Sequence, residues 1–230
     1  MGKEFLDRNL ALEAVRVTEA AALSSSFHMG RGNEKAADQA AVNAMREFLN
    51  NLSIDGRVVI GEGERDKAPM LYIGEKVGMG GPKVDIALDP LEGTTITAKG
   101  GENALSVLAM AEQGGFLHSP DIYMHKIAYG KKYEGLEIDP ESPADHLIYE
   151  LSKYSKIDVK NLVVCILDRP RHQNIISLVR KTGARIKLIT DGDVSAVIAT
   201  TVEDSGVDLY LGSGGSPEGV LAAAALRPRG

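Results

Sequence analysis

The run Asp89-Pro90-Leu91-Glu92-Gly93-Thr94-Thr95 brings two carboxylates and two hydroxyls together in seven residues. It follows the apolar run Val84–Leu88, which is typical of a buried strand. Pro90 and Gly93 predict a turn at the exit of that strand. Such a turn can direct both carboxylates and a backbone carbonyl toward one point, where Mg²⁺ or Mn²⁺ would find the oxygen ligands it prefers. Taken alone, the run is equally compatible with a turn that carries two solvated acids.

Two further strands are predicted to end in the same way. The β-branched run Val58–Ile60 leads into Gly61–Glu64, and Leu209–Leu211 leads into the glycine-rich run Gly212–Gly219, which contains Glu218. Packing alone does not require three strand ends that each deliver an acid at a glycine-rich turn. Because acids brought together without a cation repel one another, a shared site makes physical sense only with a bound metal.

Composition limits the classes of partner. The 230 residues carry 26 Lys and Arg against 32 Asp and Glu, a net charge of −6. This balance argues against a nucleic acid, because no broad basic surface is available to release counterions. No apolar stretch reaches membrane-span length and the charged N-terminus lacks a signal peptide's apolar core, so no membrane partner and a cytoplasmic location are expected. The single cysteine, Cys165, lies in an apolar run and is expected to be a buried thiol.

Hydrophobic periodicity predicts an α/β protein of two subdomains. Helices are expected over residues 8–27 and 34–50, and strands over 57–62, 84–89, 103–111 and 122–130. Beyond Gly135, strands at 161–167, 185–190 and 207–211 alternate with helices at 142–156, 172–182 and 193–201, which is typical of a parallel α/β unit. Ser216-Pro217 predicts one more helix start, with Glu218 in its first turn. We therefore expect an N-terminal α+β metal-binding subdomain over residues 1–135 and a C-terminal α/β subdomain over 136–230.

Together these motifs resemble the lithium-sensitive, metal-dependent sugar phosphatase superfamily, and within it most closely the class II fructose-1,6-bisphosphatases of bacteria. The segments that carry the resemblance occur in family order along nearly the whole chain: Gly30–Gly32, Ala36–Asp38, Ile60–Glu64, Ala68–Gly78, Asp89–Thr95, Pro120–Met124, Arg169–His172, Asp191–Asp193 and Gly214–Gly219. The resemblance implies a layered α-β-α-β-α sugar-phosphatase fold. It also implies hydrolysis of the 1-phosphate of fructose 1,6-bisphosphate to fructose 6-phosphate and phosphate, a reaction of gluconeogenesis.

The resemblance assigns roles to individual residues. Ligands of Mn²⁺ or Mg²⁺ would be Asp38, Glu62, Asp89, the Leu91 carbonyl, Glu92 and Glu218. Thr94 would hold the attacking water and Asp38 would accept its proton. Substrate contacts would come from Glu92, Gly93, Thr94, Tyr123, Lys126, Arg169, Arg171, Asp191, Asp193 and Gly215. The runs 93–95 and 212–215 are expected to expose backbone N–H groups to phosphate oxygens. The five histidines have no metal-ligand spacing and are expected at the surface or behind the site.

The sequence departs from the family pattern in two places. Asn33-Glu34 stands where members usually carry Asp-Lys, and family chains continue well past the helix that begins near Ser216, so the second subdomain is expected to be incomplete. Alternatives are a sedoheptulose 1,7-bisphosphatase, another sugar or inositol phosphatase, or an inactive truncated paralogue that binds metal or sugar phosphate. The cations Lys126, Arg169 and Arg171 favour a substrate with a second phosphate. The expected partners are a sugar bisphosphate and further copies of the chain, as a dimer or tetramer.

Overall fold

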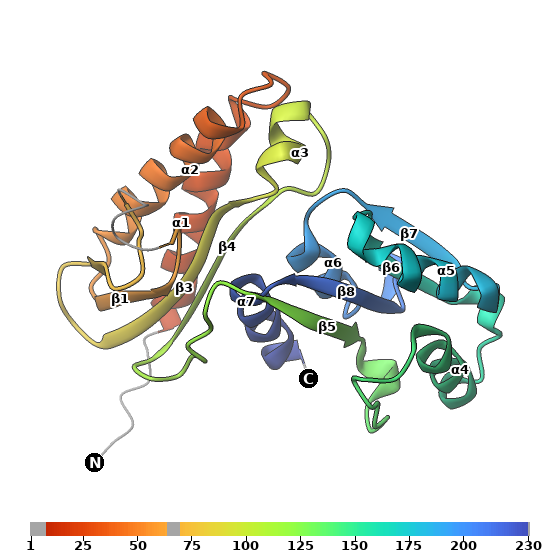
Figure 1. Cartoon of the computed structure of the whole chain (residues 1–230). Helices are drawn as coiled ribbons and strands as arrows, with labels where there is room; N and C mark the ends of the chain where they lie inside the picture. The colour runs from red at the N-terminus through yellow and green to blue at the C-terminus, as the bar shows by residue number, and fades with distance from the viewer. Residues whose placement is uncertain (1–7, 64–69, 230) are drawn as a thin grey trace, which may run out of the picture. The chain divides into compact units, whose positions relative to one another are not determined.

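The computed structural model describes residues 8–63 and 70–229 (Figure 1). The chain divides into two compact units, Met1–Asp121 (unit 1) and Ile122–Gly230 (unit 2). Each unit has a four-stranded sheet among its described residues, and helices cover the sheets, so the expected α/β class is confirmed. Over the two described ranges, no helix is long and apolar enough to cross a membrane.

Unit 1 contains a mixed parallel and antiparallel sheet with the strand order β2-β1-β3-β4. Strand β1 (Asp55–Ile60) runs parallel to β3 (Lys83–Glu92), whereas β2 (Lys76–Val77) and β4 (Leu105–Glu112) pair antiparallel with their neighbours. Helices α1 (Arg8–Ser26) and α2 (Glu34–Leu49) lie side by side against this sheet, and the short α3 (Thr94–Lys99) follows β3 directly (Figure 1).

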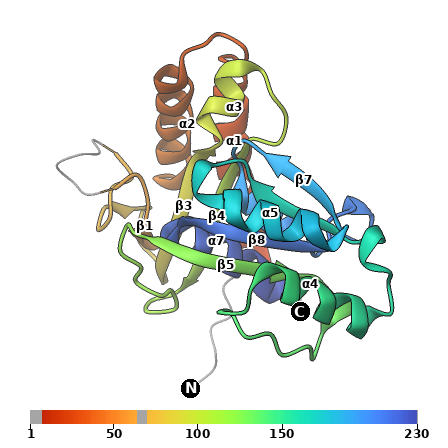
Figure 2. The same ribbon diagram turned by 45° about the vertical axis from the view of Figure 1, so that its right-hand side comes forward.

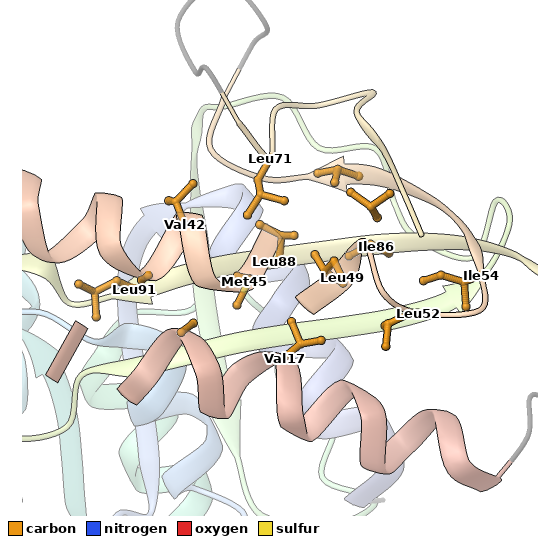
Figure 3. Packing of buried hydrophobic residues seen from close by; sticks show 14 of the residues in the cluster. Val17, Val42, Met45, Leu49, Leu52, Ile54, Leu71, Ile86, Leu88 and Leu91 are labelled. Atoms are coloured by element: carbon orange, nitrogen blue, oxygen red, sulfur yellow. The ribbon is translucent and has the colours of Figure 1, made fainter. Parts of the chain in front are cut away.

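The core of unit 1 lies between the two long helices and the sheet, as Figure 3 shows. Val17, Met45 and Leu49 face it from the helices, and alternate residues of β3, such as Ile86 and Leu88, face it from the sheet. Since side chains along a strand alternate between its two faces, Asp89 lies on the face away from this core. The apolar core therefore fixes the direction of a predicted ligand.

Unit 2 has the strand order β5-β8-β6-β7. Strand β5 (Tyr123–Tyr129) is antiparallel to β8 (Leu209–Gly215), and β6 (Val163–Leu167) is parallel to both β8 and β7 (Arg185–Ile189). Helices α4 (Ala144–Ser155) and α5 (Gln173–Thr182) pack on one face, with residues such as Ile166 (Figure 2). Helices α6 (Asp193–Ala199) and α7 (Ser216–Leu226) pack on the other face, with Cys165 (Figure 1). Five short 3₁₀ turns complete the described elements: η1 (Lys131–Tyr133), η2 (Val159–Asn161), η3 (Pro170–His172), η4 (Glu203–Ser205) and η5 (Arg227–Arg229).

Most predicted elements are present within a few residues of their expected bounds. The sequence suggested a boundary near residue 135, whereas the boundary along the chain lies between Asp121 and Ile122. The difference arises from β5, which pairs along its whole length with β8 and so is part of the second sheet. The cysteine prediction is confirmed, because Cys165 is a buried free thiol and burial raises its pKa to about 11.

Truncation of α2 at two neighbouring positions tests the packing of unit 1. Leu49 is fully buried, whereas the adjacent Phe48 is 43% exposed. We expect Leu49→Ala to lower the free energy of unfolding by about 2–5 kcal/mol, because it leaves a cavity in the core. Phe48→Ala should cost less than half as much, although it removes a larger side chain. Urea unfolding measures both changes, and equal losses would mean that α2 does not bury the face containing Leu49.

Candidate functional site

Three of the predicted metal ligands lie close together in unit 1. Asp38 is half-buried in α2, Glu62 follows β1, and Asp89 lies in β3. Burial and the like charges of Asp38 and Asp89 together raise the pKa of Glu62 to about 8. Burial also raises the pKa of Asp38. Because the carboxylates of Asp38 and Asp89 act on that of Glu62 through space, the structure brings together three acids that are distant in the sequence.

The position of Glu62 depends on a close backbone contact. A β-carbon added to Gly61 would lie 2.2 Å from the Leu71 carbonyl oxygen, so only glycine fits there. The Glu62 amide donates to the same oxygen at 3.0 Å, and the Ile73 amide donates to the Gly63 oxygen at 2.9 Å. These bonds hold the end of β1 against residues 71–73. Glu64, the second acid of this motif, lies outside the described residues.

A β-bulge, and not the predicted turn, sets the direction of Asp89 and Glu92. Strand β3 continues to Glu92, and its pairing with β4 shifts register between Asp89↔Val107 and Glu92↔Leu105. Leu88 and Leu91 both lie in the core, although residues three apart in a regular strand face opposite sides. The extra residue therefore places the acids that follow them on the same face. The strand therefore extends three residues beyond its expected end at Asp89, and the predicted turn is confined to Gly93, because proline also suits a bulge within a strand.

Thr94 begins α3, a helix that the sequence did not predict. Gly93 precedes it with φ +102°, a left-handed conformation that glycine adopts without strain. Gly30 and Gly32, in the loop before α2, donate their amides to the carbonyls of Thr97 and Ala98 at 2.9 Å each. This loop ties α3 to the start of α2, so Thr94 and Asp38 lie on adjoining helices. The helix was missed because β-branched threonines have a low intrinsic helix propensity and follow a glycine.

The carboxylate oxygens of unit 1 are the type of ligand that a hard cation prefers, but they are not arranged as a coordination shell. Across the described ranges 8–63 and 70–229, no group of three or more His, Cys, Asp or Glu side chains is arranged to hold a metal ion. One oxygen of Asp89 accepts the Leu91 amide at 3.0 Å. All the candidate donors are oxygens, the choice of Mg²⁺ and Mn²⁺. A cation would offset both the burial of the Glu62 carboxylate and its repulsion by Asp38 and Asp89, which together raise its pKa.

In unit 2, Tyr123 and Arg171 form a stacked pair. The Arg171 guanidinium carbon lies 4.7 Å from the centre of the Tyr123 ring. Its Nε and Nη2 atoms both donate to the Ser213 carbonyl, at 3.0 and 2.8 Å. Arg169 is half-buried nearby in the chain, just before η3. The structure thus holds one predicted phosphate-binding arginine in a defined position.

Lys126 and Asp193, both predicted to contact substrate, form a buried ion pair with each other. Lys126 Nζ lies 2.6 Å from Asp193 Oδ2, and the two side chains are 6% and 8% exposed. They lie against Gly214, where an added β-carbon would come within 2.7 Å of Asp193 Oδ2. Sequence reasoning missed this pairing because the two residues are far apart in the chain. By contrast, Asp191 is half-buried in the turn before α6.

The glycine run 212–215 was expected to form a turn after the strand, but it is part of β8 itself. It pairs with β5 from Lys126↔Gly212 to Tyr123↔Gly215. Gly215 precedes α7, and a β-carbon there would lie 2.0 Å from Glu218 Oε2. That oxygen is buried and has no hydrogen-bond partner among the residues that the structure describes. Glu218 belongs to unit 2, whereas the other predicted metal ligands belong to unit 1.

Comparisons with known proteins agree on one family. The family described as bacterial fructose-1,6-bisphosphatase, glpX-encoded, matches residues 8–230. The chain is 52% identical over 222 residues to fructose-1,6-bisphosphatase 1 class 2 of Escherichia coli K12, and equally to the class 2 proteins of E. coli O6:H1 and Shigella flexneri. Each alignment covers 96% of this chain and 66% of the relative, so the chain spans just under two thirds of their length.

A solved structure of an extragenic suppressor from Pyrococcus furiosus also aligns with the chain. The TM-score is 0.45 at 12% sequence identity, with 94% of this chain and 82% of that chain covered.

The buried ion pair of unit 2 predicts unequal effects of two matched substitutions. Asp193→Asn leaves the Lys126 ammonium buried without its counter-charge, which typically costs about 3–5 kcal/mol. Asp191→Asn removes a carboxylate two residues earlier in the chain that is not part of this pair, and should change stability by less than about 0.5 kcal/mol. Thermal and urea unfolding compare the two variants. Similar stabilities would show that Lys126 and Asp193 are not paired in solution.

Proposed function

Because the chain belongs to the family of bacterial, glpX-encoded fructose-1,6-bisphosphatases, we propose that it hydrolyses the 1-phosphate of fructose 1,6-bisphosphate. The products are fructose 6-phosphate and phosphate, as gluconeogenesis requires. The observation that carries the proposal is the convergence of Asp38, Glu62 and Asp89 in unit 1, seen in the pKa of Glu62. Relatives named as class 2 fructose-1,6-bisphosphatases are 52% identical to this chain, which spans 66% of their length.

The proposed cofactor is a divalent cation, Mn²⁺ or Mg²⁺. It would be held by the side chains of Asp38, Glu62, Asp89 and Glu92 and by the Leu91 carbonyl, with Glu218 as a further ligand. When bound, such a cation lowers the pKa of water and neutralises negative charge on a phosphoryl group. The bulge in β3 supports this assignment, because it places Asp89 and Glu92 on one face of the sheet.

Two residues of unit 1 are proposed to act on the attacking water. The Thr94 hydroxyl would hold the water in position, and the Asp38 carboxylate would accept its proton. Their placement on α3 and α2, joined through the Gly30–Gly32 loop, supports a shared task. Glu92 and Gly93 would contact the substrate beside them.

Unit 2 is proposed to supply the remaining contacts to a sugar bisphosphate. Arg169 and Arg171 would bind the phosphate that is not cleaved, since guanidinium groups form charge-assisted hydrogen bonds with phosphate oxygens. The sugar and its hydroxyls would meet Tyr123, Lys126, Asp191, Asp193 and Gly215. We also propose a cytoplasmic location and a homo-oligomeric assembly, either a dimer or a tetramer.

Phosphate release from fructose 1,6-bisphosphate tests the proposed reaction directly. We expect activity with added Mn²⁺, no activity after exhaustive chelation, and recovery when Mn²⁺ is returned. Glu62→Gln should abolish turnover because it removes a cation ligand, whereas Glu19→Gln, a matched change on the exposed side of α1, should leave it intact. Full activity of the chelated protein, or equal activity of the two variants, would refute the metal-dependent mechanism.

The water-positioning role of Thr94 has its own signature. Thr94→Ala should lower kcat by about 10²- to 10⁴-fold with little change in KM, because it removes an interaction needed at the transition state. Thr94→Ser keeps a hydroxyl and should lose far less. Steady-state kinetics with saturating Mn²⁺ measures both. A wild-type kcat in Thr94→Ala would show that this residue serves only to start α3.

A further inference from the structure

His172 is a buried residue that the proposed reaction does not use. It is the last residue of the 3₁₀ turn η3, which follows β6, and it is only 1% exposed. The ring Nδ1 lies 2.8 Å from the Leu167 carbonyl oxygen, and Nε2 lies 2.9 Å from the Ser213 amide nitrogen. A carbonyl can only accept and an amide N–H can only donate. The ring is therefore neutral, with its proton on Nδ1 and its lone pair at Nε2 directed at Ser213.

Ser213 lies on a stretch of β8 where the neighbouring strand has ended. Within the described chain, β6 pairs with β8 only at Val164↔Leu209 and Cys165↔Tyr210. Further along this edge, the Ser213 amide donates to His172 and the Ser213 carbonyl accepts both bonds from Arg171. Two consecutive side chains of η3 thus satisfy the backbone groups that an adjacent strand would otherwise satisfy.

The His172 ring packs closely against the backbone of β8 at Gly212. A β-carbon added to Gly212 would lie 3.3 Å from His172 Cε1 and 3.4 Å from Nε2, so glycine lets the ring approach the strand closely. On the far side of the same turn, Arg171 stacks over Tyr123 of β5 at 4.7 Å. The η3 turn is consequently fixed at two points, by the His172 ring inside and by the Arg171 guanidinium outside.

We propose that His172 is a positioning residue that binds η3 to β8 at Ser213 and thereby holds the Arg171 guanidinium in place over Tyr123. The inference rests on the proposed function, in which Arg171 meets the phosphate that is not cleaved. Without the His172 contact, Arg171 has to be ordered when substrate binds, and this ordering weakens binding without altering the chemical step. Loss of the His172 contact should therefore raise KM and leave kcat unchanged.

Two amide substitutions separate the two hydrogen bonds of the ring. Glutamine places a polar atom near the position of Nε2 and can still accept from the Ser213 amide. Asparagine places one near Nδ1 and can still donate to Leu167, but it is too short to reach Ser213. His146→Asn, at an exposed histidine of α4, is the matched control. Each variant is assayed for KM and kcat with Mn²⁺ and for hydrogen exchange at the Ser213 amide.

His172→Asn should raise KM for fructose 1,6-bisphosphate by about tenfold, the loss expected for one hydrogen bond, with kcat within about twofold of wild type. The Ser213 amide should exchange about tenfold faster. His172→Gln and His146→Asn should resemble wild type in both measurements. Added to Arg171→Ala, His172→Asn should raise KM no further, because it acts through that arginine. Gly212→Ala, which presses on the ring while leaving it in place, should also raise KM and the exchange rate of the Ser213 amide, but by smaller factors.

Equal KM values for His172→Asn and His172→Gln would overturn the proposal, as would a loss confined to kcat or an additive double mutant. If His172→Asn does not fold, Gly212→Ala decides by the same criteria. If the wild type releases no phosphate, the proposed reaction fails by itself. The exchange rate at Ser213 and the NMR signal of the Arg171 Nε–H group then decide whether His172 holds Arg171, since neither measurement needs turnover. An unchanged Arg171 signal in His172→Asn would refute the positioning role.

Discussion

The burial of the Glu62 carboxylate near those of Asp38 and Asp89 is the constraint on which the architecture of unit 1 depends. Each of the three acids comes from a different part of the chain, and burial, together with the like charges of the other two, raises the pKa of Glu62 to about 8. A fold keeps such a cluster only if other forces position it. Here the Gly30–Gly32 loop ties α2 to α3, the contact at Gly61 fixes the end of β1, and the bulge turns β3. The apolar core beneath the sheet supplies the stability that the acids remove.

In unit 2, glycines of β8 allow polar side chains to pack directly against the backbone. Along β8, Gly212 admits the His172 ring, Gly214 admits the Lys126–Asp193 pair, and Gly215 admits the Glu218 carboxylate. A β-carbon at Gly214 or Gly215 would collide with the group that is now accommodated there, and one at Gly212 would press on the His172 ring. The glycine-rich run is thus a strand that lets polar side chains approach the backbone closely, and the groups so placed are mostly those that the resemblance assigned to substrate or metal.

Sequence patterns were sufficient for the class of fold and for most elements, because hydrophobic periodicity directly reflects which faces are buried. They were insufficient where local signals have two structural meanings. Pro90 and Gly93 suit a turn or a bulge, and only pairing with β4 decides for the bulge. The glycines of β8 suit a loop or a strand, and only pairing with β5 decides for the strand. Long-range pairs such as Lys126 with Asp193 leave no local signal, so neither this pair nor the contact of His172 with Ser213 was predictable.

Thermal unfolding of the wild type and of Glu62→Gln, each in chelator and in Mn²⁺, tests most directly whether the acid cluster is built for a cation. In chelator the variant should melt no lower than the wild type, because it removes a repelling acid. Mn²⁺ at 100 times its dissociation constant should stabilise the wild type by about 2.7 kcal/mol and the variant by much less. A wild type that Mn²⁺ does not stabilise, or a variant stabilised equally, would contradict this explanation of the three carboxylates.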